Sequence, residues 1–440
     1  MEAPVINVGV LTDEKAVSFV FNTAYVLTET GAFLTGEQHA LFVGGKIIFN
    51  GKPYLELFFE PTSPEATFDL KAVTIGNQFH WQRKEDQRFK GALNLVIDNE
   101  GITAINQVDA EEYLTNVISS EMSASASKEL LKAHAIISRS WLFSQIEKKW
   151  QRSNQNDASS YPNEQRSCNE LIRWYDQSEH TIFDVCADDH CQRYQSVTRA
   201  FTPAVKEAVQ ETRGEVLMFN DMICDTRFSK CCGGASEQFE SCWEPVRHPY
   251  LTSVRDLYHV STLPDLTQEK EADKWIRSNP DAFCQKNNPE IMKQILNNYD
   301  QETTDFYRWE VAYTQEQLSN LIYRKSGIDF GQIMDLIPVE RGTSGRIIKL
   351  KVVGTLCTFT FGKELEIRRI LSESHLYSSA FVVDKELRND IPTLFRLKGA
   401  GWGHGVGLCQ IGAAVMSTQG YDYRQILAHY YPGSTLEKRY

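Results

Sequence analysis

The sequence lacks the long apolar run that a membrane-spanning helix requires. No stretch of its 440 residues approaches the roughly 18 consecutive apolar side chains needed to cross a bilayer. The first ten residues, Met1 to Val10, contain neither a basic segment nor an apolar segment long enough for a secretory signal. We therefore expect no transmembrane segment. Either the export information is absent from this sequence, or the protein stays inside the cell.

Positive charge is also scarce. Lys and Arg number 46 against 58 Asp and Glu, which gives a formal net charge of −12. No run of basic residues could neutralise a phosphate backbone, so nucleic-acid binding is disfavoured. The sequence has no internal repeat, and its 42% apolar and 24% charged residues are typical of a soluble folded protein.

The length and the patterning indicate an α+β protein with two lobes, or one core with large insertions. Residues 1–108 form a β-rich region, which we expect to be an antiparallel sheet or partial barrel. Its short β-branched or aromatic runs lie between Gly, Asn, Asp and Pro turn signals. These runs are Ile6 to Leu11, Val17 to Phe21, Lys46 to Ile48, Tyr54 to Phe59 and Leu93 to Ile97.

Helical periodicity begins at about residue 109. Leu114, Val117 and Ile118 recur at helical spacing, and a second helix is predicted from Lys128 to Lys148. Insertions are expected at about 150–179, which is polar, and at 267–327, which is mostly helical and charged. Strand patterns resume at 347–353, 355–361 and 395–398, and a short helix closes the chain at 424–429.

Glu121 is the first candidate for chemistry. It lies seven residues after Leu114 and four after Val117, so a continuous helix would project its carboxylate from the apolar stripe. Burial raises the pKa of a carboxyl group, as a general acid requires near neutral pH. The alternative is that Glu121 ends the helix and meets water.

Two cations follow on the second helix. Lys132 and Arg139 are seven residues apart and share a face. They could hold a carboxylate-bearing sugar substituent or tune Glu121, although the spacing alone favours a solvated helix face.

A compact set of metal-binding side chains follows. His180, Cys186, His190 and Cys191 place two imidazoles and two thiols within twelve residues, a ligand set that suits tetrahedral zinc in a structural clip. The alternative is buried free cysteines and a surface histidine. A second group, Cys224, Cys231, Cys232 and Cys242, contains no histidine, which favours a core or disulfide role over metal.

Glycine recurs at nearly every second position from Gly399 to Gly412, which allows the backbone to approach a ligand or another strand closely. His404 and Gln410 could present hydrogen bonds to sugar hydroxyls. Alternatively, His404 could cap a carbonyl in a tight bend. A dinucleotide site is excluded because the flanking strand–helix unit and its acidic residue are absent.

Three ordered motifs resemble the SpoIID/LytB family of bacterial stage II sporulation protein D and amidase-enhancer proteins. Tyr113 to Met122 continues into Glu129 to Trp141 as the first. The second runs from Thr212 through Phe228-Ser229-Lys230-Cys231-Cys232-Gly233-Gly234 to Leu251. The third runs from Gly401 to Gly412 and ends at Gly433.

The resemblance implies a lytic transglycosylase that acts on the MurNAc–GlcNAc bond of peptidoglycan strands stripped of stem peptides. Glu121 matches the family's catalytic glutamate, and Lys132 and Arg139 match positions that line its cleft. We expect Ser229, Lys230, His404 and Gln410 to contact substrate, although the loop at 228–232 departs from the usual family pattern. Residues 109–436 would form the catalytic region.

The resemblance also implies the setting of this activity. Some members carry zinc near the histidine–cysteine cluster, and the family works at the cell envelope. The enhancer branch suggests a second possibility, a non-catalytic module that binds glycan strands and stimulates a cell-wall amidase.

Overall fold

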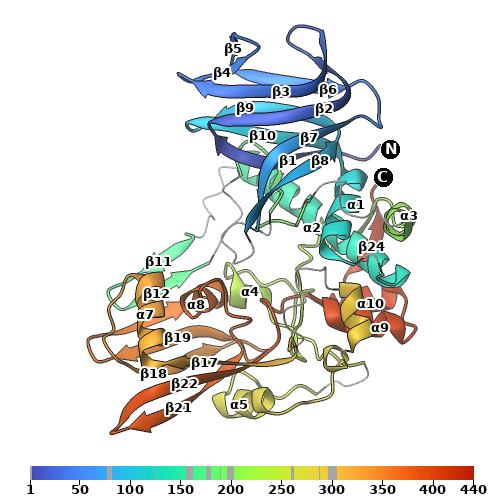
Figure 1. Cartoon of the computed structure of the whole chain (residues 1–440). Helices are drawn as coiled ribbons and strands as arrows, with labels where there is room; N and C mark the ends of the chain where they lie inside the picture. Colours follow the sequence, from blue (N-terminus) through green and yellow to red (C-terminus); the bar gives the residue numbers. More distant parts are fainter. Residues whose placement is uncertain are drawn as a thin grey trace.

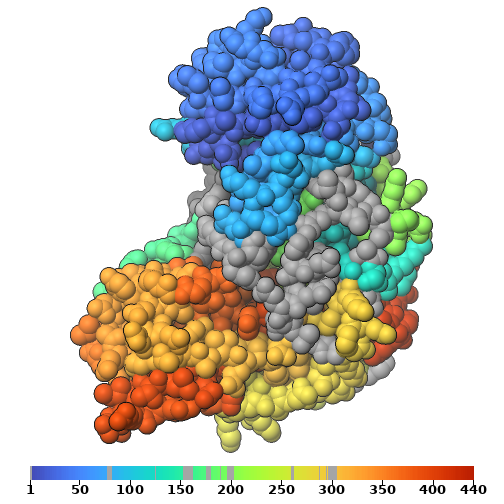
Figure 2. Space-filling view, viewed as in Figure 1, coloured from blue at the N-terminus to red at the C-terminus, as the bar shows by residue number. Residues whose placement is uncertain are grey.

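A computed structural model describes residues 2–76, 82–123, 125–154, 162–174, 180–188, 190–195, 203–258, 262–286, 288–295 and 305–440. It has a mixed α+β architecture, as predicted. A β-rich body formed by the first hundred residues lies at one end, a second β-rich body with helices of its own lies at the other end, and further helices lie between them (Figure 1). In the space-filling view the outline narrows between the two β-rich bodies (Figure 2).

The N-terminal strands belong to one large sheet. Its order is β13-β1-β10-β9-β6-β2-β3-β4-β5, with β7 joining β2 to β8, and these strands do not close into a barrel within the described part of the chain. Its pairings are antiparallel except for β1 with β13. The strands are β1 (Val5–Glu14), β2 (Ala16–Leu27), β3 (Ala32–Val43), β4 (Lys46–Phe49), β5 (Lys52–Tyr54), β6 (Glu56–Pro61), β7 (Thr67–Ile75), β8 (Arg83–Lys90), β9 (Ala92–Asp98), β10 (Gly101–Asp109) and β13 (Val185–Cys186).

All five predicted strand runs lie in this sheet, but β3, β7, β8 and β10 were not predicted. The sequence of β8, RKEDQRFK, is charged at most positions, and only Gln87 and Phe89 are buried. An edge strand of this kind buries too few apolar side chains to show the alternating pattern of a strand.

The helical region begins where the sheet ends. Asp109 closes β10 and caps α1 (Ala110–Glu121), since its carboxylate accepts hydrogen bonds from the backbone N–H groups of Glu111 and Glu112 at 2.8 and 3.3 Å. Helix α2 (Lys128–Asn154) follows and extends beyond the predicted end at Lys148. Residues 133–144 of α2 are all buried, so this helix is a central element of the core.

The second β-rich body has its own core. Strands β11 (Glu164–Arg166), β12 (Glu170–Arg173), β20 (Thr358–Gly362), β19 (Ile347–Gly354) and β18 (Ile333–Arg341) form one sheet, in which β12 and β20 are parallel. A second sheet contains β17 (Arg308–Thr314), β22 (Ile391–Ala400) and β21 (Phe381–Arg388). Helices α7 (Gln315–Ser326) and α8 (Glu364–Ile370) contribute buried side chains to the core they share.

The two expected insertions therefore include paired strands. Residues 150–179 contain β11 and β12, while 155–161 and 175–179 lie outside the described residues. Residues 267–327 contain α5 (Glu269–Arg277), a 3-10 turn (Phe283–Gln285) and α6 (Pro289–Ile295), but also β17. The prediction that this segment is mostly helical missed β17, whose partner β22 lies about 80 residues later.

The remaining elements belong to neither of the two β-rich bodies. They are α3 (Pro203–Glu211), β14 (Glu215–Phe219), β15 (Met222–Ile223), β16 (Phe228–Ser229), α4 (Phe239–Cys242), β23 (Leu408–Cys409), α9 (Gln410–Thr418), α10 (Tyr423–Tyr430) and β24 (Thr435–Lys438). No helix in the described part of the chain is long and apolar enough to cross a membrane.

Candidate functional site

A pocket of about 340 Å³ lies at the C-terminal end of α1. Glu121 is the last residue of this helix and is half-buried, whereas Leu114, Val117 and Ile118 on the same helix are fully buried. The pocket wall combines residues of α1, α2, the 190–193 segment, β16, α4, α8 and the glycine loop. Segments more than 280 residues apart in the sequence thus meet at this site.

Glu121 is held by one backbone contact. Its Oε1 atom accepts a hydrogen bond from the Arg193 backbone N–H at 3.3 Å. Arg193 follows His190 and Cys191, which also line the pocket. The loop that carries the histidine–cysteine cluster therefore positions a donor against the Glu121 carboxylate.

The predicted contacts Ser229, Lys230, His404 and Gln410 all line the same pocket. Strand β16 places Ser229 beside Cys409, because Phe228 and Ser229 pair in parallel with Leu408 and Cys409. The parallel pairing brings the second motif next to the third.

Two buried polar atoms of the pocket wall have no hydrogen-bond partner among the described residues. They are the Ser229 hydroxyl and the Gln192 amide oxygen. The other end of the Gln192 amide donates to the Ser138 carbonyl at 3.4 Å. Unpaired buried polar groups are costly, so their presence in a pocket wall suits a polar ligand that completes them.

The charge of the pocket is mixed, with basic residues in excess. Four cationic side chains line it, against the two carboxylates of Glu121 and Glu364; the four are Arg193, Arg227, Lys230 and Arg368. Arg227 makes a bidentate ion pair with Asp225 at 2.6 and 2.9 Å and lies over the Trp243 ring at 4.4 Å. Five further pocket residues were not predicted from the sequence, because their positions depend on tertiary packing: Arg193, Arg227, Arg368, Trp141 and Trp243.

His404 has a structural role in the glycine loop. Its Nδ1 accepts the Val406 backbone N–H at 3.0 Å, and the ring also has a hydrogen bond with the Phe228 backbone. Burial lowers its pKa well below the usual range, so the ring is neutral. His404 thus bonds backbone groups of the bend, and its ring packs against Trp243.

The glycines allow close packing of this loop. Gly405 has a φ of +78°, and a Cβ at this position would lie 2.3 Å from the Arg346 guanidinium carbon. Gly407 has a φ of +70° and would meet the Arg227 carbonyl oxygen at 2.0 Å. Only glycine fits at these two positions, where the loop passes against the arginine side chain and the chain that leads into β16.

Lys132 and Arg139 do not line the pocket, so the pocket gives no support to the expectation that they contact substrate. Arg139 is fully buried in α2 and forms a bidentate ion pair with Glu111. Lys132 lies 2.8 Å from a Glu211 oxygen and 5.4 Å from the Tyr423 ring centre. Helical spacing cannot distinguish a buried ion pair from a solvated face, so the sequence did not reveal these partners.

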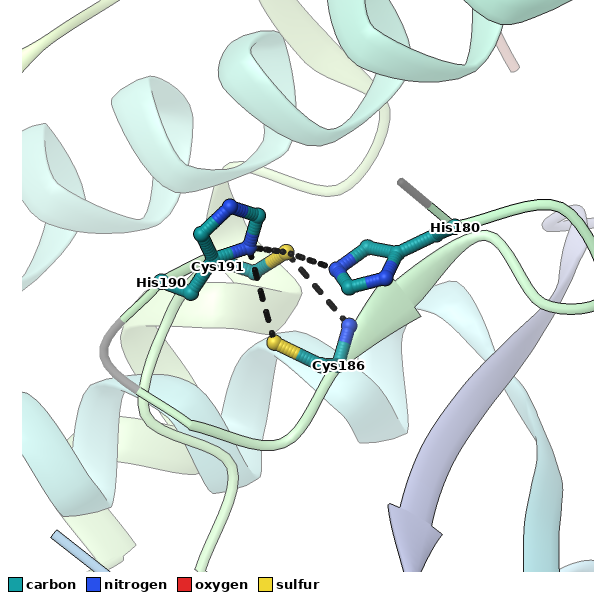
Figure 3. Close-up of side chains that lie close together, drawn as sticks. All are labelled: His180, Cys186, His190 and Cys191. Carbon is teal, nitrogen blue, oxygen red and sulfur yellow. Dashed lines mark hydrogen bonds between the residues drawn. The ribbon is translucent and has the colours of Figure 1, made fainter. Parts of the chain in front are cut away.

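His180, Cys186, His190 and Cys191 do come together (Figure 3). Cys191 Sγ lies 3.4 Å from His180 Nε2 and 3.7 Å from His190 Nδ1, and Cys186 Sγ lies 3.9 Å from His190 Nδ1. The other thiol and the two imidazoles lower the pKa of Cys186, which favours the thiolate form that binds metals. These four side chains could hold a metal ion.

The second predicted cysteine group is divided in space. All ten cysteines are described and none forms a disulfide, which corrects the disulfide alternative. Cys224 and Cys242 are buried separately in the core, whereas Cys231 and Cys232 lie near Cys284 and Cys409. Cys284 and Cys409 lie too far along the sequence from Cys231 and Cys232 to have been grouped with them.

Comparison with known proteins gives two family matches. A model described as "Stage II sporulation protein" matches residues 98–219, and one described as "Domain of unknown function (DUF8618)" matches residues 237–407. The first match contains α1, α2 and the histidine–cysteine cluster. The second contains most of the C-terminal β-rich body and ends within the glycine loop.

Similar curated proteins span most of this chain. An uncharacterized protein of Brachyspira hyodysenteriae is 25% identical over 347 residues, 78% of this chain and 71% of its own. Stage II sporulation protein D of Bacillus amyloliquefaciens is 22% identical over 332 residues, 75% and 74% of the two chains. The amidase enhancer of Bacillus subtilis is 23% identical over 254 residues, 52% of this chain but 32% of its own. Together with the three ordered motifs, these matches support the assignment of the chain to the SpoIID/LytB family.

Proposed function

We propose that the chain is a lytic transglycosylase that cleaves the MurNAc–GlcNAc bond of peptidoglycan glycan strands, with Glu121 as the acid and base. The observation that carries the proposal is the pocket itself. It presents the Glu121 carboxylate at the C-terminal end of α1, two polar groups that are unpaired among the described residues, two tryptophans and an excess of cations. The similarity to the SpoIID/LytB family supports a cell-wall substrate and an envelope-associated role.

The chemistry requires only one carboxyl group. Glu121 in its protonated form donates its proton to the glycosidic oxygen as the bond to the anomeric carbon breaks. The sugar's own 6-hydroxyl then bonds to that carbon, and the Glu121 carboxylate takes the hydroxyl proton. The products are an anhydro-muramyl end and a free GlcNAc hydroxyl, and Glu121 regains its starting state.

The wall of the pocket has matching roles in this proposal. The Arg193 backbone N–H fixes the orientation of the Glu121 carboxyl group. Ser229 and Gln192 would hydrogen-bond sugar hydroxyl or acetamido groups, and the Trp243 ring would pack against a sugar face. Lys230 and Arg368 suit the lactyl carboxylate of a muramic acid residue that has lost its peptide.

We propose zinc as the ion of the histidine–cysteine cluster. Tetrahedral zinc with Zn–S near 2.3 Å and Zn–N near 2.0 Å separates its sulfur and nitrogen ligands by about 3.5 Å. The three sulfur–nitrogen distances of 3.4, 3.7 and 3.9 Å lie around this value. With all four positions taken by protein ligands, the ion would stabilise the loop that carries Arg193 and would leave no site for substrate.

A second candidate function is a glycan-binding enhancer of a cell-wall amidase. The similarity to the Bacillus subtilis amidase enhancer favours it, and this chain spans about a third of that protein. The same pocket would then bind glycan without turnover, and Glu121 would act only as a hydrogen-bond acceptor.

One experiment separates the two candidates. The wild-type chain and the Glu121→Gln variant are incubated with denuded glycan strands, and anhydro-muramyl ends are measured by mass spectrometry. Glu112→Gln is the matched control, because Glu112 is also half-buried on α1 but lies outside the pocket. If wild type and Glu112→Gln produce anhydro-muramyl ends and Glu121→Gln does not, the chain is the enzyme. If the wild-type chain binds glycan without forming this product and stimulates an amidase, it is the enhancer.

A further inference from the structure

A second cluster of potential metal ligands lies in the core behind the pocket. The Sγ atoms of Cys232, Cys284 and Cys409 and a carboxylate oxygen of Asp256 all lie within 4.8 Å of one another. Asp256, Cys284 and Cys409 are fully buried, and Cys232 is 3% exposed. The four residues come from separate parts of the chain: the loop after β16, the 256 segment, the 3-10 turn and the start of α9.

The distances in the cluster fit one ion better than a disulfide. The Sγ atoms of Cys232 and Cys284 are 3.7 Å apart, whereas a disulfide bond is about 2.05 Å long. Two sulfur ligands of tetrahedral zinc are separated by about 3.8 Å, given a Zn–S distance near 2.3 Å. Cys231 is a further thiol near Cys284 and Cys409, but it is not one of the four groups whose ligand atoms lie within 4.8 Å of one another.

Hydrogen bonds around the cluster support charged ligands. Cys409 Sγ accepts the backbone N–H groups of Cys232 at 3.2 Å and Gly412 at 3.4 Å. Asp256 accepts the Tyr430 hydroxyl at 2.6 Å and the Cys284 backbone N–H at 2.8 Å. Such outer contacts orient metal ligands and offset their negative charge.

Asp256 provides a second, independent indication of a cation. It is fully buried and has no ion pair with any Lys, Arg or His among the described residues. A buried carboxylate is costly unless it is paired with a cation or binds a metal. Gly412 keeps α9 close to this group, because a Cβ there would lie 2.5 Å from an Asp256 oxygen.

We propose that Cys232, Cys284, Cys409 and Asp256 bind a second structural metal ion, a divalent ion of the zinc class. Three thiolates favour a soft or borderline metal, and four protein ligands close the coordination sphere, as in structural zinc sites. The ion would hold together four segments that are separated by long stretches of the sequence. It would also fix the pocket wall from behind, because Cys232 lies two residues after Lys230 and Cys409 lies directly before Gln410.

The test is the metal content of the purified full-length chain and of variants, measured by inductively coupled plasma mass spectrometry. The wild-type chain should hold two ions, and Cys186→Ser combined with Cys191→Ser should leave one. Adding Cys284→Ser to that double variant should remove the remaining ion. Adding Cys224→Ser instead should not, since Cys224 is a buried cysteine outside both clusters.

A folded Cys186→Ser/Cys191→Ser variant that holds no metal after purification with zinc would overturn the proposal. If this variant does not fold, zinc X-ray absorption of the wild-type chain decides. Two ions with about 2.5 sulfur ligands per ion on average are expected from the two sites together. A single ion with two sulfur ligands would contradict the second site, and neither result depends on glycan cleavage.

Discussion

Arg139 and Glu111 form a bidentate ion pair inside the protein, with Nε–Oε1 and Nη2–Oε2 distances of 2.9 and 2.7 Å. The pair joins α2 to α1, the helix that ends in Glu121. Arg139 also donates to the Glu215 carbonyl of β14 at 3.0 Å, and the Tyr440 hydroxyl donates to Glu111. One arginine thus ties two helices, a strand and the C-terminal residue together.

Replacing Arg139 alone should therefore destabilise the chain strongly. Arg139→Met leaves the Glu111 carboxylate buried without a cation, which costs about 3–5 kcal/mol. The combined Arg139→Met and Glu111→Leu variant should recover a large part of that loss, because no charge remains buried. Chemical denaturation of the full chain measures both, and equal losses in the single and double variants would refute this account.

Acid should destabilise the protein partly through His134. Burial lowers the pKa of this histidine to about 3, against about 6.5 when unfolded. Between these values the unfolded chain binds a proton that the folded chain does not, so stability falls as the pH falls from 6.5 to 3. The contribution is up to about 1.4 kcal/mol per pH unit.

His134→Gln removes this titration while retaining a side chain that can hydrogen-bond Gln410, the partner of His134 Nε2 at 3.1 Å. The unfolding free energy of the variant should decline less steeply with acid than that of the wild type. The half-buried His248, His375 and His429 titrate in both proteins, so the difference between the two slopes isolates His134. Identical slopes would show that His134 does not contribute.

Ser229→Ala should separate ligand binding from stability. The buried Ser229 hydroxyl has no hydrogen-bond partner in the described part of the chain, so its removal should leave the unfolding free energy unchanged or slightly higher. If the hydroxyl bonds a sugar, glycan affinity should fall by about 1 kcal/mol, roughly fivefold. Calorimetric binding to denuded glycan fragments together with thermal unfolding checks both, and unchanged affinity would remove Ser229 from the ligand contacts.

Removing metal from the histidine–cysteine cluster should loosen the loop that positions Glu121. Cys186→Ser should raise the hydrogen-exchange rate of residues 185–195, including the Arg193 amide that bonds Glu121. Cys357→Ser is the control, because Cys357 is a partly exposed cysteine outside both clusters. Unchanged exchange in Cys186→Ser would mean that the loop is ordered without an ion.

The sequence predicted those features that depend on local pattern. The spacing of Leu114, Val117 and Ile118 located α1, and the short spacing from His180 to Cys191 located a cluster that does assemble. For Glu121 the sequence left two possibilities, a buried acid on the apolar stripe or a solvated residue at the helix end. The structure places Glu121 at the end of the helix, half-buried and in the wall of a pocket.

Features that depend on distant partners could not be predicted. Arg139 has the spacing of a surface residue, and only packing of α1 against α2 supplies Glu111 as its partner. Cys284 and Cys409 lie 52 and 177 residues after Cys232, so no spacing rule connects them. Strand β8 is an edge strand, and it is extended because it pairs with β7, not because its own composition favours a strand.

In the proposed reaction, Glu121 cleaves glycan by using the sugar's own 6-hydroxyl as the nucleophile. The most direct test digests denuded strands in ¹⁸O-labelled water and weighs the new chain ends by mass spectrometry. Wild type should give ends one water lighter than a hydrolysis product and free of ¹⁸O, and Glu121→Gln should be slower by about 10²–10⁴-fold. Ends that contain ¹⁸O, or equal rates for wild type and Glu121→Gln, would contradict the account.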